Sequence, residues 1–498
     1  MKAKIILTFI LVLSLAIFCS CNKTGDLESE SNSEALSVEG GETTLDITDI
    51  SSDEVESEQI SSEADTDEAE SESEKISEAQ KDKQEIMKEI YDSTKNNQLP
   101  IGGWSTPASA LRDGYTGVEG SYDKIFKMIA ASGINYMITL EEWSSGYWPL
   151  ETLSSASKAG IRIYYNCVGM EAPYSLEKIN KMLESEYRDA LAGIYVKDEP
   201  LLSELDELAA LTNDIRAGLD GVNIPVFSNL LPTYANSGMI GDDYRTYVRE
   251  YIEKTNPDIL MFDYYPYHIG TGDSIAKMMA NIAIGIEEAK AAGIPLYTFI
   301  QSSGSSGMRE PTYEELKLDM HINLAMGVKG VAYFLCCEHY DNWGYTTMID
   351  YDGNKTTMYN KIAKLNSEIN AMKGVYLDYE FKNIIISGYY NEGYTALDSV
   401  SDSILVDEFE YLRGITTTNT GKIATGCFEG EDGLGFYVVN LDYKKNGVAN
   451  LVLETDVEYE IWGKDGLMDI GVIDDEHGPL TISLSKGEGV FIKTKQTR

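Results

Sequence analysis

Short apolar, β-rich runs recur along the middle of the chain about every thirty residues, and segments with helical periodicity separate most of them. The runs begin near Ile101, Ile134, Ile161, Ile194, Ile224, Ile259, Leu296 and Val331. Eight such units match a (β/α)8 barrel, whereas an open doubly wound sheet needs fewer strands and normally carries a glycine-rich nucleotide turn, which this sequence lacks. The pattern predicts an α/β fold, a TIM barrel over residues 85–373.

Local signals mark where the helices between these runs begin and end. Glycines that can supply the left-handed helix stop precede several runs, at Gly133, Gly160, Gly293 and Gly327. Capping-box spacing predicts two helix starts, one at Ser203 with Asp206 and one at Thr312 with Glu315.

Polar and aromatic residues gather where the predicted strands end. In such barrels the active centre is assembled from residues at the carboxyl ends of the strands. These ends read Gly103-Trp104, Glu141-Glu142-Trp143, Asn166, Asp198-Glu199, Ser228-Asn229, Asp263 to His268, Gln301 to Ser303, and Glu338 to Tyr340 with Trp343 beyond. Aromatic faces stack on pyranose rings, while amides and acids bind hydroxyl groups, so this set suits a sugar better than a phosphate. For each tryptophan the alternative is a core anchor under a loop.

Glu199 is the first catalytic candidate. It follows the run Gly193 to Asp198 and precedes Pro200, which should hold it in extended geometry at a strand end, projecting into the cleft above. The alternative is a solvated turn.

The chain changes character beyond residue 373. Segments such as Gly435–Asn440, Glu458–Trp462 and Gly489–Lys493 alternate or run apolar between turn residues, which predicts an antiparallel β-sandwich over residues 374–498. Such a domain either packs against the barrel or binds carbohydrate, and we expect packing.

The N-terminus carries an export signal. Lys2 and Lys4 precede a short apolar stretch that is too short for a confident membrane span. The stretch runs into Cys21 in a segment that resembles a bacterial lipobox, which implies a signal peptide over residues 1–21 and a lipid on Cys21. We therefore expect an exported lipoprotein at the cell surface or membrane of a bacterium. A plain secretory signal is the alternative.

Residues 22–84 read as a disordered acidic tether. Residues 26–80 contain 20 acidic residues, a single base and no aromatic residue, so this stretch cannot bury enough apolar surface to fold. It accounts for much of the net charge of -42, a charge that argues against nucleic acid as a partner. The oligomeric state is not predicted.

Neither cysteines nor carboxylates form a recognisable metal site. Cys167, Cys336, Cys337 and Cys427 lack zinc-site spacing, and the neighbouring Cys336 and Cys337 are expected to be buried thiols. The segment Asp350 to Asn354 resembles part of a calcium loop but lacks a later bidentate acid, so a tight turn is expected. No cofactor is predicted.

Taken together, these segments carry a family resemblance. Residues 99–498 resemble the (β/α)8 glycoside hydrolases of the clan A type followed by a β-sandwich of the sort appended to barrel β-galactosidases. Lys197-Asp198-Glu199-Pro200 is similar to the Asn-Glu-Pro that carries the fourth-strand acid/base of that clan, which implies this role for Glu199. Asp198 replaces the asparagine that helps to hold the sugar 2-hydroxyl. Strand seven ends in Gln301, where retaining members carry a glutamate nucleophile.

The resemblance and the strand ends define a candidate site. Glycoside cleavage needs a protonated carboxyl and an ionised partner. Glu199 is assigned the first role, and the partner is ranked as Asp263, then Glu338, then Glu141 or Glu142, with retention or inversion left open. The alternative for Asp263 is that it only accepts structural hydrogen bonds. The predicted substrate-binding residues are Trp104, Trp143, Asp198, Asn229, Tyr265, Tyr267, His268, Gln301 and Trp343.

Two other functions are compatible with the same features. A barrel that has lost catalysis could serve as a surface glycan-binding lipoprotein, which the missing acid on strand seven allows. A solute-binding lipoprotein of an importer is less compatible, because it needs two hinged α/β lobes rather than eight continuous units and a β tail.

Overall fold

The computed structural model describes residue 87 and residues 97–112, 117–140, 150–167, 172–388, 392–409, 412–417, 421–431, 433–454, 456–474 and 478–496. The chain divides into two units, residues 1–86 and 87–498, and every described residue belongs to the second. The predicted signal peptide, Cys21 and the acidic tether therefore lie outside the described residues, as do Glu141, Glu142 and Trp143. Among the described residues, no helix combines the length and apolarity needed to cross a membrane.

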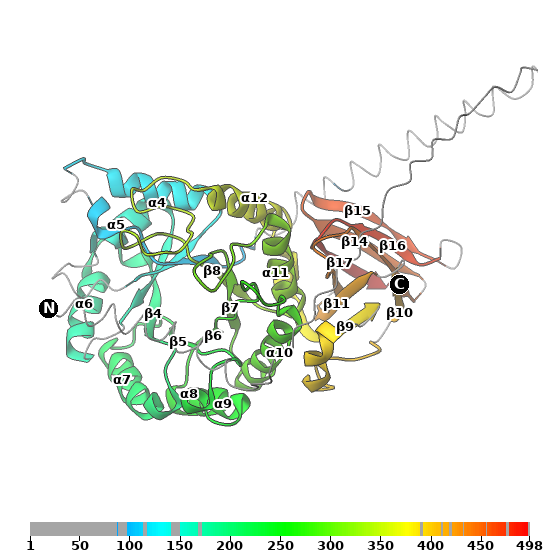
Figure 1. Ribbon diagram of the computed structural model, residues 1–498, viewed down its shortest axis with the longest axis horizontal. Helices are drawn as coiled ribbons and strands as arrows, with labels where there is room; N and C mark the ends of the chain where they lie inside the picture. The colour runs from blue at the N-terminus through cyan, green and yellow to red at the C-terminus, as the bar shows by residue number, and fades with distance from the viewer. Residues whose placement is uncertain are drawn as a thin grey trace, which may run out of the picture. The chain divides into compact units, whose positions relative to one another are not determined.

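Eight parallel strands follow one another around a closed barrel, and the last pairs with the first (Figure 1). The strands are β1 (Ile101–Trp104), β2 (Tyr136–Ile138), β3 (Arg162–Asn166), β4 (Leu191–Asp198), β5 (Val226–Leu230), β6 (Leu260–Phe262), β7 (Leu296–Gln301) and β8 (Gly330–Phe334). Each begins within three residues of its predicted start. The predicted TIM barrel is confirmed.

Helices surround the barrel. They are α4 (Ser121–Ala131), α5 (Leu150–Ala159), α6 (Ala172–Glu184), α7 (Leu205–Gly218), α8 (Ser237–Ile240), α9 (Tyr244–Thr255), α10 (Ile275–Ala292), α11 (Tyr313–Ala325) and α12 (Thr357–Ala371). The four predicted glycine stops all have positive φ. The Thr312–Glu315 capping box is confirmed, but the prediction for Ser203 is wrong, because Ser203 lies within the short 3-10 helix Leu202–Glu204 and α7 begins only at Leu205.

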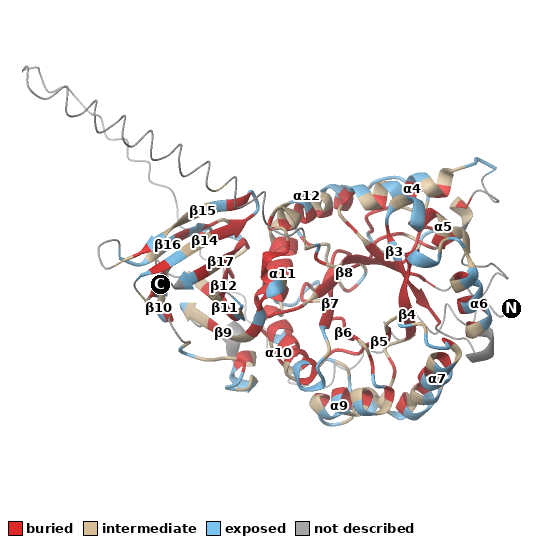
Figure 2. Cartoon of the chain, turned by 180° about the vertical axis from the view of Figure 1, so that it is seen from behind, coloured by how far each residue is buried: buried red, intermediate tan, exposed pale blue. Residues whose placement is uncertain are grey.

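Aromatic rings fill the barrel interior, whose strands are buried almost throughout (Figure 2). Small residues make room for them. A Cβ on Gly102 would lie 2.1 Å from the Tyr136 ring, and one on Gly330 would lie 2.5 Å from the Tyr297 ring. Large rings opposite glycines fill a small barrel without voids. The described cysteines are all buried free thiols, namely Cys167, Cys336, Cys337 and Cys427. This agrees with the expectation for the neighbouring residues Cys336 and Cys337.

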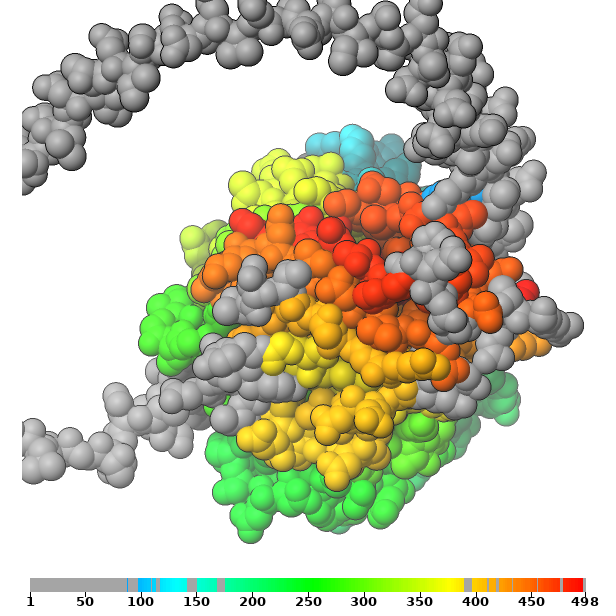
Figure 3. All heavy atoms as spheres, turned by 90° about the vertical axis from the view of Figure 1, so that its right-hand side faces the viewer, coloured from blue at the N-terminus to red at the C-terminus, as the bar shows by residue number. Residues whose placement is uncertain are grey.

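The β domain consists of two antiparallel sheets, as predicted, and its strands cover the face seen in Figure 3. One sheet has the order β10-β13-β16, and the other has the order β15-β14-β17-β12-β11-β9. The strands are β9 (Glu380–Gly388), β10 (Leu412–Thr417), β11 (Lys422–Gly430), β12 (Gly433–Asn440), β13 (Gly447–Leu453), β14 (Val457–Gly463), β15 (Gly466–Ile473), β16 (Leu480–Leu484) and β17 (Gly489–Gln496). Short 3-10 helices, Val375–Asp378 and Glu392–Ser399, flank β9.

Helix α11 joins the barrel to the β domain. It contacts β11 and β12, and its residues from Glu315 to Ala325 are all buried. Gly426 of β11 approaches so closely that a Cβ there would lie 1.9 Å from the Ala325 carbonyl oxygen. His321 Nδ1 lies 2.9 Å from the Tyr437 hydroxyl across the same interface. The β domain therefore packs on the barrel, as expected.

Candidate active site

The acidic pair Asp198-Glu199 lies at the carboxyl end of β4. The Glu199 amide donates to the Asn229 carbonyl at 2.9 Å, which fixes the residue beside β5. The expectation of extended backbone at Glu199 is wrong, because its φ is +44°, in the left-handed region. Left-handed backbone costs a residue other than glycine about 1–2 kcal/mol, and such strain clusters at functional sites. Glu199 as a whole is half-buried.

Asn229 connects three carboxyl-bearing positions on neighbouring strands. Its Nδ2 donates to Asp263 Oδ1 at 2.8 Å and to Asp198 Oδ1 at 3.3 Å. The Tyr195 hydroxyl also donates to Asp198 Oδ1, at 2.5 Å. Asp263 and Asn229 are 4% and 2% exposed. The ends of β4, β5 and β6 thus bring Asp198, Glu199 and Asp263 together, as the sequence predicts, and we call these three residues the carboxyl cluster.

Burial and mutual repulsion disfavour full ionisation of the carboxyl cluster. Burial raises the pKa of Glu199 well above its usual value, and the charges of Asp263 and Asp198 and a side-chain hydrogen bond with Asp263 raise it further. Burial raises the pKa of Asp263 to about 7, with a smaller contribution from Asp198. Burial also raises the pKa of Asp198, against the hydrogen bonds from Tyr195 and Asn229. Two buried carboxyls that repel each other favour a state in which one of them holds a proton.

Tyrosines surround this cluster. Desolvation, followed by the charges of Asp263 and Glu199, raises the pKa of Tyr234 well above its usual value, although the residue as a whole is 37% exposed. Burial and the charge of Asp263 do the same for Tyr265, and burial followed by Glu199 raises the pKa of Tyr345. These tyrosines stay protonated at neutral pH and can donate hydrogen bonds.

Half-buried aromatic rings extend from the carboxyl cluster across the barrel end. Tyr265 packs on Phe334 with ring centroids 4.9 Å apart, and Phe334 stacks on Trp104 at 5.5 Å. Trp104 in turn stacks on Trp343 at 6.3 Å, and Trp343 contacts Tyr345 at 5.5 Å. These five residues, which we call the aromatic wall, keep part of their ring surface exposed. The prediction that Trp104, Trp343 and Tyr265 lie at one barrel end agrees with this arrangement.

Two buried polar atoms beside the cluster and the wall have no hydrogen-bond partner. They are Asn229 Oδ1 and Trp104 Nε1. Because an unsatisfied buried polar atom costs about 1–3 kcal/mol, such atoms call for an explanation. Asn229 lies on β5 and Trp104 on β1, so the acceptor and the donor lie at separate positions, where each suits a hydroxyl group of a ligand.

Gln301 and Tyr267 do not belong to this site, contrary to the sequence prediction. Gln301 is fully buried, its Nε2 donates to the carbonyls of Tyr267, Ser303 and Arg309, and its Oε1 accepts from the Tyr267 amide at 2.8 Å. Tyr267 is also fully buried, and its hydroxyl donates to the Glu315 carbonyl at 2.8 Å. These contacts use the polar groups of both side chains, so they brace the loops after β6 and β7 rather than face a ligand.

Glu338 has a structural role, contrary to its prediction as a candidate for the second catalytic carboxyl. Its Oε1 accepts from the Trp343 amide at 3.3 Å, and its Oε2 accepts from the Tyr351 amide at 3.2 Å. It thereby closes the loop after β8. His268 is half-buried, and its backbone forms an isolated antiparallel β-bridge with Met308. This bridge lies outside the carboxyl cluster, so the substrate role of His268 stays a prediction.

Among the described residues, no group of three or more His, Cys, Asp or Glu side chains is arranged to hold a metal ion. The segment from Asp350 to Asn354 forms the expected tight turn, since Asp350 Oδ1 accepts from the Asn354 amide at 2.7 Å.

The sequence prediction missed Tyr195, Phe334, Tyr234 and Tyr345. Tyr195 lies three positions before Asp198, which in a regular strand puts the two side chains on opposite faces. A register shift between β4 and β5 over this span brings them together. Phe334 was detectable as the last residue of β8, whereas Tyr234 and Tyr345 lie in loops away from the strand ends.

A comparison with protein-family models gives no match, and a comparison with curated proteins gives none either. Solved structures that match the chain include a glucosidase from Croceicoccus marinus, at 9% identity and a TM-score of 0.42, over 82% of this chain and 97% of that one. A GH5_18 from Bifidobacterium longum subsp. infantis matches at 12% identity and a TM-score of 0.40, over 54% of this chain and 79% of that one. A putative alpha-L-fucosidase from Bacteroides thetaiotaomicron matches at 13% identity and a TM-score of 0.38, over 55% and 94%.

Proposed function

We propose that this protein is an extracytoplasmic, lipid-anchored glycoside hydrolase in which Glu199 is the general acid/base. The observation that carries the proposal is the carboxyl cluster, in which Glu199 is held next to Asp263 with a strongly raised pKa. The aromatic wall adjoins this pair, and half-buried rings suit the faces of pyranose sugars. The strain at Glu199 and the unpartnered atoms of Asn229 and Trp104 support a ligand site at this end of the barrel.

Each member of the carboxyl cluster has a distinct proposed role. Glu199, whose pKa is raised well above its usual value, is the proton donor to the leaving glycosidic oxygen. Asp263 is the ionised partner, since its pKa is about 7 and Asn229 donates to it. Asp198 is held by Tyr195 and Asn229, which orients it toward a sugar hydroxyl rather than toward the reaction centre.

We favour a retaining reaction because the charges of Glu199 and Asp263 act on each other. Inverting enzymes separate the two carboxyls by about 6.5–9.5 Å to admit a water molecule, whereas retaining enzymes place them about 5 Å apart. The charge of Asp263 is the largest contribution to the raised pKa of Glu199 after burial, as expected for two carboxyls that lie close together. Asp263 would then attack the anomeric carbon, Glu199 would protonate the departing oxygen, and Glu199 would afterwards take a proton from the water that releases the sugar.

We expect kcat/KM to follow a bell-shaped pH profile. The active pair carries one proton, on Glu199, so activity rises as Asp263 loses its proton near pH 7 and falls at higher pH as Glu199 is deprotonated. The two apparent pKa values belong to the pair. Initial rates from pH 4 to 10 check this expectation, and an acid limb near pH 4, as for a solvated carboxyl, would contradict it.

A second function is favoured by the end of β7. Gln301 occupies the position of the missing acid, and its amide is consumed by bonds to the loops, so nothing at this strand end can attack a sugar. The protein would then be a surface glycan-binding lipoprotein. Activity on a panel of labelled glycans separates the two functions, because binding measured by calorimetry without release of reducing ends would favour the receptor.

The lipid anchor is tested at Cys21. We expect Cys21→Ala to move the protein from the membrane fraction of the native bacterium to the soluble fraction, because a diacylglyceryl group and a long tether would be its attachment. Fractionation with immunoblotting measures this change, and mass spectrometry of the mature N-terminal peptide detects the lipid. Cys19→Ala is the matched control. If the Cys21→Ala variant is found in the membrane fraction to the same extent as the wild type, the proposed lipid anchor is contradicted.

A further inference from the structure

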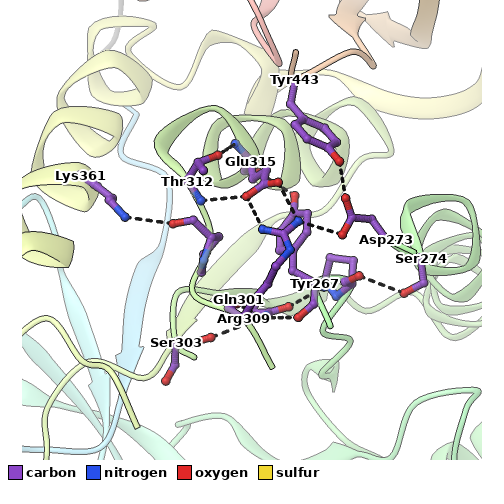
Figure 4. Close-up of polar contacts among 12 residues, drawn as sticks. Tyr267, Asp273, Ser274, Gln301, Ser303, Arg309, Thr312, Glu315, Lys361 and Tyr443 are labelled. Atoms are coloured by element: carbon purple, nitrogen blue, oxygen red, sulfur yellow. Dashed lines mark hydrogen bonds and ion pairs between the residues drawn. The ribbon is translucent and has the colours of Figure 1, made fainter. Parts of the chain in front are cut away.

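The turn between β12 and β13 places one tyrosine of the β domain against the barrel. The Tyr443 hydroxyl donates to Asp273 Oδ2, and Asp273 lies in the loop between β6 and α10 (Figure 4). The turn is firmly held, because Asp442 Oδ1 accepts from the amides of Lys444 and Lys445 at 2.7 and 3.0 Å. The amide of Gly487 also donates to the Asp442 carbonyl at 3.1 Å. Tyr443 therefore projects from a rigid support.

Asp273 and Tyr443 belong to a larger network that ends in α11. Arg309 donates from Nη2 to Asp273 Oδ1 at 2.8 Å and forms a bidentate pair with Glu315 at 2.7 Å for both bonds (Figure 4). The guanidinium also lies 5.0 Å from the centroid of the Tyr267 ring. Glu315 is itself fixed, since it is the capping-box residue of α11. One oxygen of Asp273 is thus held by the barrel and the other by the β domain.

The loop between β6 and α10, residues 263–274, carries Asp263 at its start and Asp273 near its end. Its two ends are joined, because the amide and hydroxyl of Ser274 donate to the Pro266 carbonyl at 3.0 and 3.3 Å. Pro266 directly follows Tyr265 of the aromatic wall. Asp273 is therefore linked through Ser274 and Pro266 to the residues that face the site.

The outer part of this loop has few other supports. Residues 269–272 are exposed, Ile269 to 56%, and two of them are glycines. Ile269 donates its amide to the Gly307 carbonyl at 3.1 Å, which ties the loop to the one after β7. Segments with exposed backbone and few apolar contacts have low local stability, so each anchor matters.

We propose that Tyr443 is a positioning residue of the active site, through which the β domain holds the loop that carries Asp263 and Tyr265. The catalytic part of this inference rests on the proposed function. The β domain then contributes to turnover without touching the substrate, because it restricts the loop through Asp273. Misplacement of reacting groups by about 1 Å can cost up to 100-fold in rate, which gives such an anchor a measurable effect.

Tyr443→Phe tests the proposal, because it removes the hydroxyl and keeps the ring. Tyr459→Phe is the matched control, since the Tyr459 hydroxyl also donates to a carboxylate, Asp469 Oδ2 at 3.2 Å, but does so between β14 and β15 within the β domain. Hydrogen–deuterium exchange of amides 263–274 is measured first in both variants and the wild type. We expect faster exchange in this loop for Tyr443→Phe and no change for Tyr459→Phe.

Kinetics supply the second measurement. On a glycan that the wild type cleaves, we expect Tyr443→Phe to lower kcat by about tenfold, the scale of one lost hydrogen bond to a charged group, with a smaller change in KM. Asp273→Asn should act in the same direction, and the double variant should be no worse than the poorer single variant, because both break one connection. The acid limb of the pH profile should also shift in Tyr443→Phe and stay unchanged in Tyr459→Phe.

The outcomes separate the two proposals. If the wild type cleaves no glycan, the proposed function fails, and loop exchange alone decides the role of Tyr443. If the amides of residues 263–274 exchange at the same rate in Tyr443→Phe as in the wild type, that role is overturned. Unchanged kcat and pH profile in an active Tyr443→Phe protein would overturn it as well, even if its melting temperature falls, since the contact would then be only structural.

Discussion

Replacing Glu199 with glutamine is expected to lower kcat/KM on an unactivated glycan by about 10²- to 10⁴-fold, the range over which a general acid/base contributes. Glutamine keeps the shape but cannot donate the proton to the leaving oxygen. The loss should be smaller for an aryl glycoside whose leaving group needs no protonation. Initial rates on both substrates measure this difference, and an equal loss on both would show that Glu199 acts in some other way.

Folding of the Glu199→Gln variant should be unimpaired. Carboxyls with raised pKa values in the folded state hold protons that the unfolded chain has lost at neutral pH, so they make stability fall as pH rises from about 4 through the folded pKa values. Removal of one such group should leave the melting temperature at pH 7 equal to or above that of the wild type. Glu310→Gln is the matched control, because this half-buried carboxylate pairs with Lys361 away from the cluster, and its turnover should match the wild type.

Asp263→Asn is expected to have the larger effect, a loss of at least about 10⁴-fold in kcat/KM, the scale on which a member of a catalytic unit acts. An amide cannot form the glycosyl ester. Loss of the Asp263 charge should also lower the pKa of Glu199, because that charge is the largest contribution after burial. Any residual activity should therefore decline at a lower pH than in the wild type. Rates across pH measure both effects.

The control for Asp263 lies at the opposite end of the same strand. Asp258 precedes β6, pairs with Arg216 and accepts from the Val226 amide at 2.8 Å. Asp258→Asn is expected to reduce stability and leave kcat unchanged. Activity of Asp263→Asn within tenfold of the wild type would remove Asp263 from the catalytic pair and leave it as the hydrogen-bond partner of Asn229.

The sequence predicted the barrel and the location of the carboxyl cluster because both follow from periodicity. Parallel strands present their carboxyl ends at one edge, so Asp198, Asn229 and Asp263 had to meet once the strand ends were located. The eight repeated units and the glycine stops were enough to predict the barrel. The segments with a period of two residues were enough to predict the β domain.

Side-chain direction and loop geometry could not be predicted in this way. Gln301 ends a strand like the others, yet its amide donates to the carbonyls of Tyr267, 34 residues earlier, and Arg309, eight residues later. Glu338 braces Tyr351, and this contact depends on how the loop after β8 returns. Local rules gave extended backbone at Glu199, but the contact with β5 imposes a left-handed conformation. Tertiary contacts decide each of these cases.

The most direct test of the central claim is to follow the anomeric NMR signals of a panel of glycans incubated with the wild-type protein. We predict that at least one glycan is cleaved and that the first sugar released has the anomeric configuration of the substrate, because Asp263 is assigned as the nucleophile of a retaining pair with Glu199. A glycan that binds but yields no new anomeric signal would contradict the assignment of Glu199 as a catalytic acid.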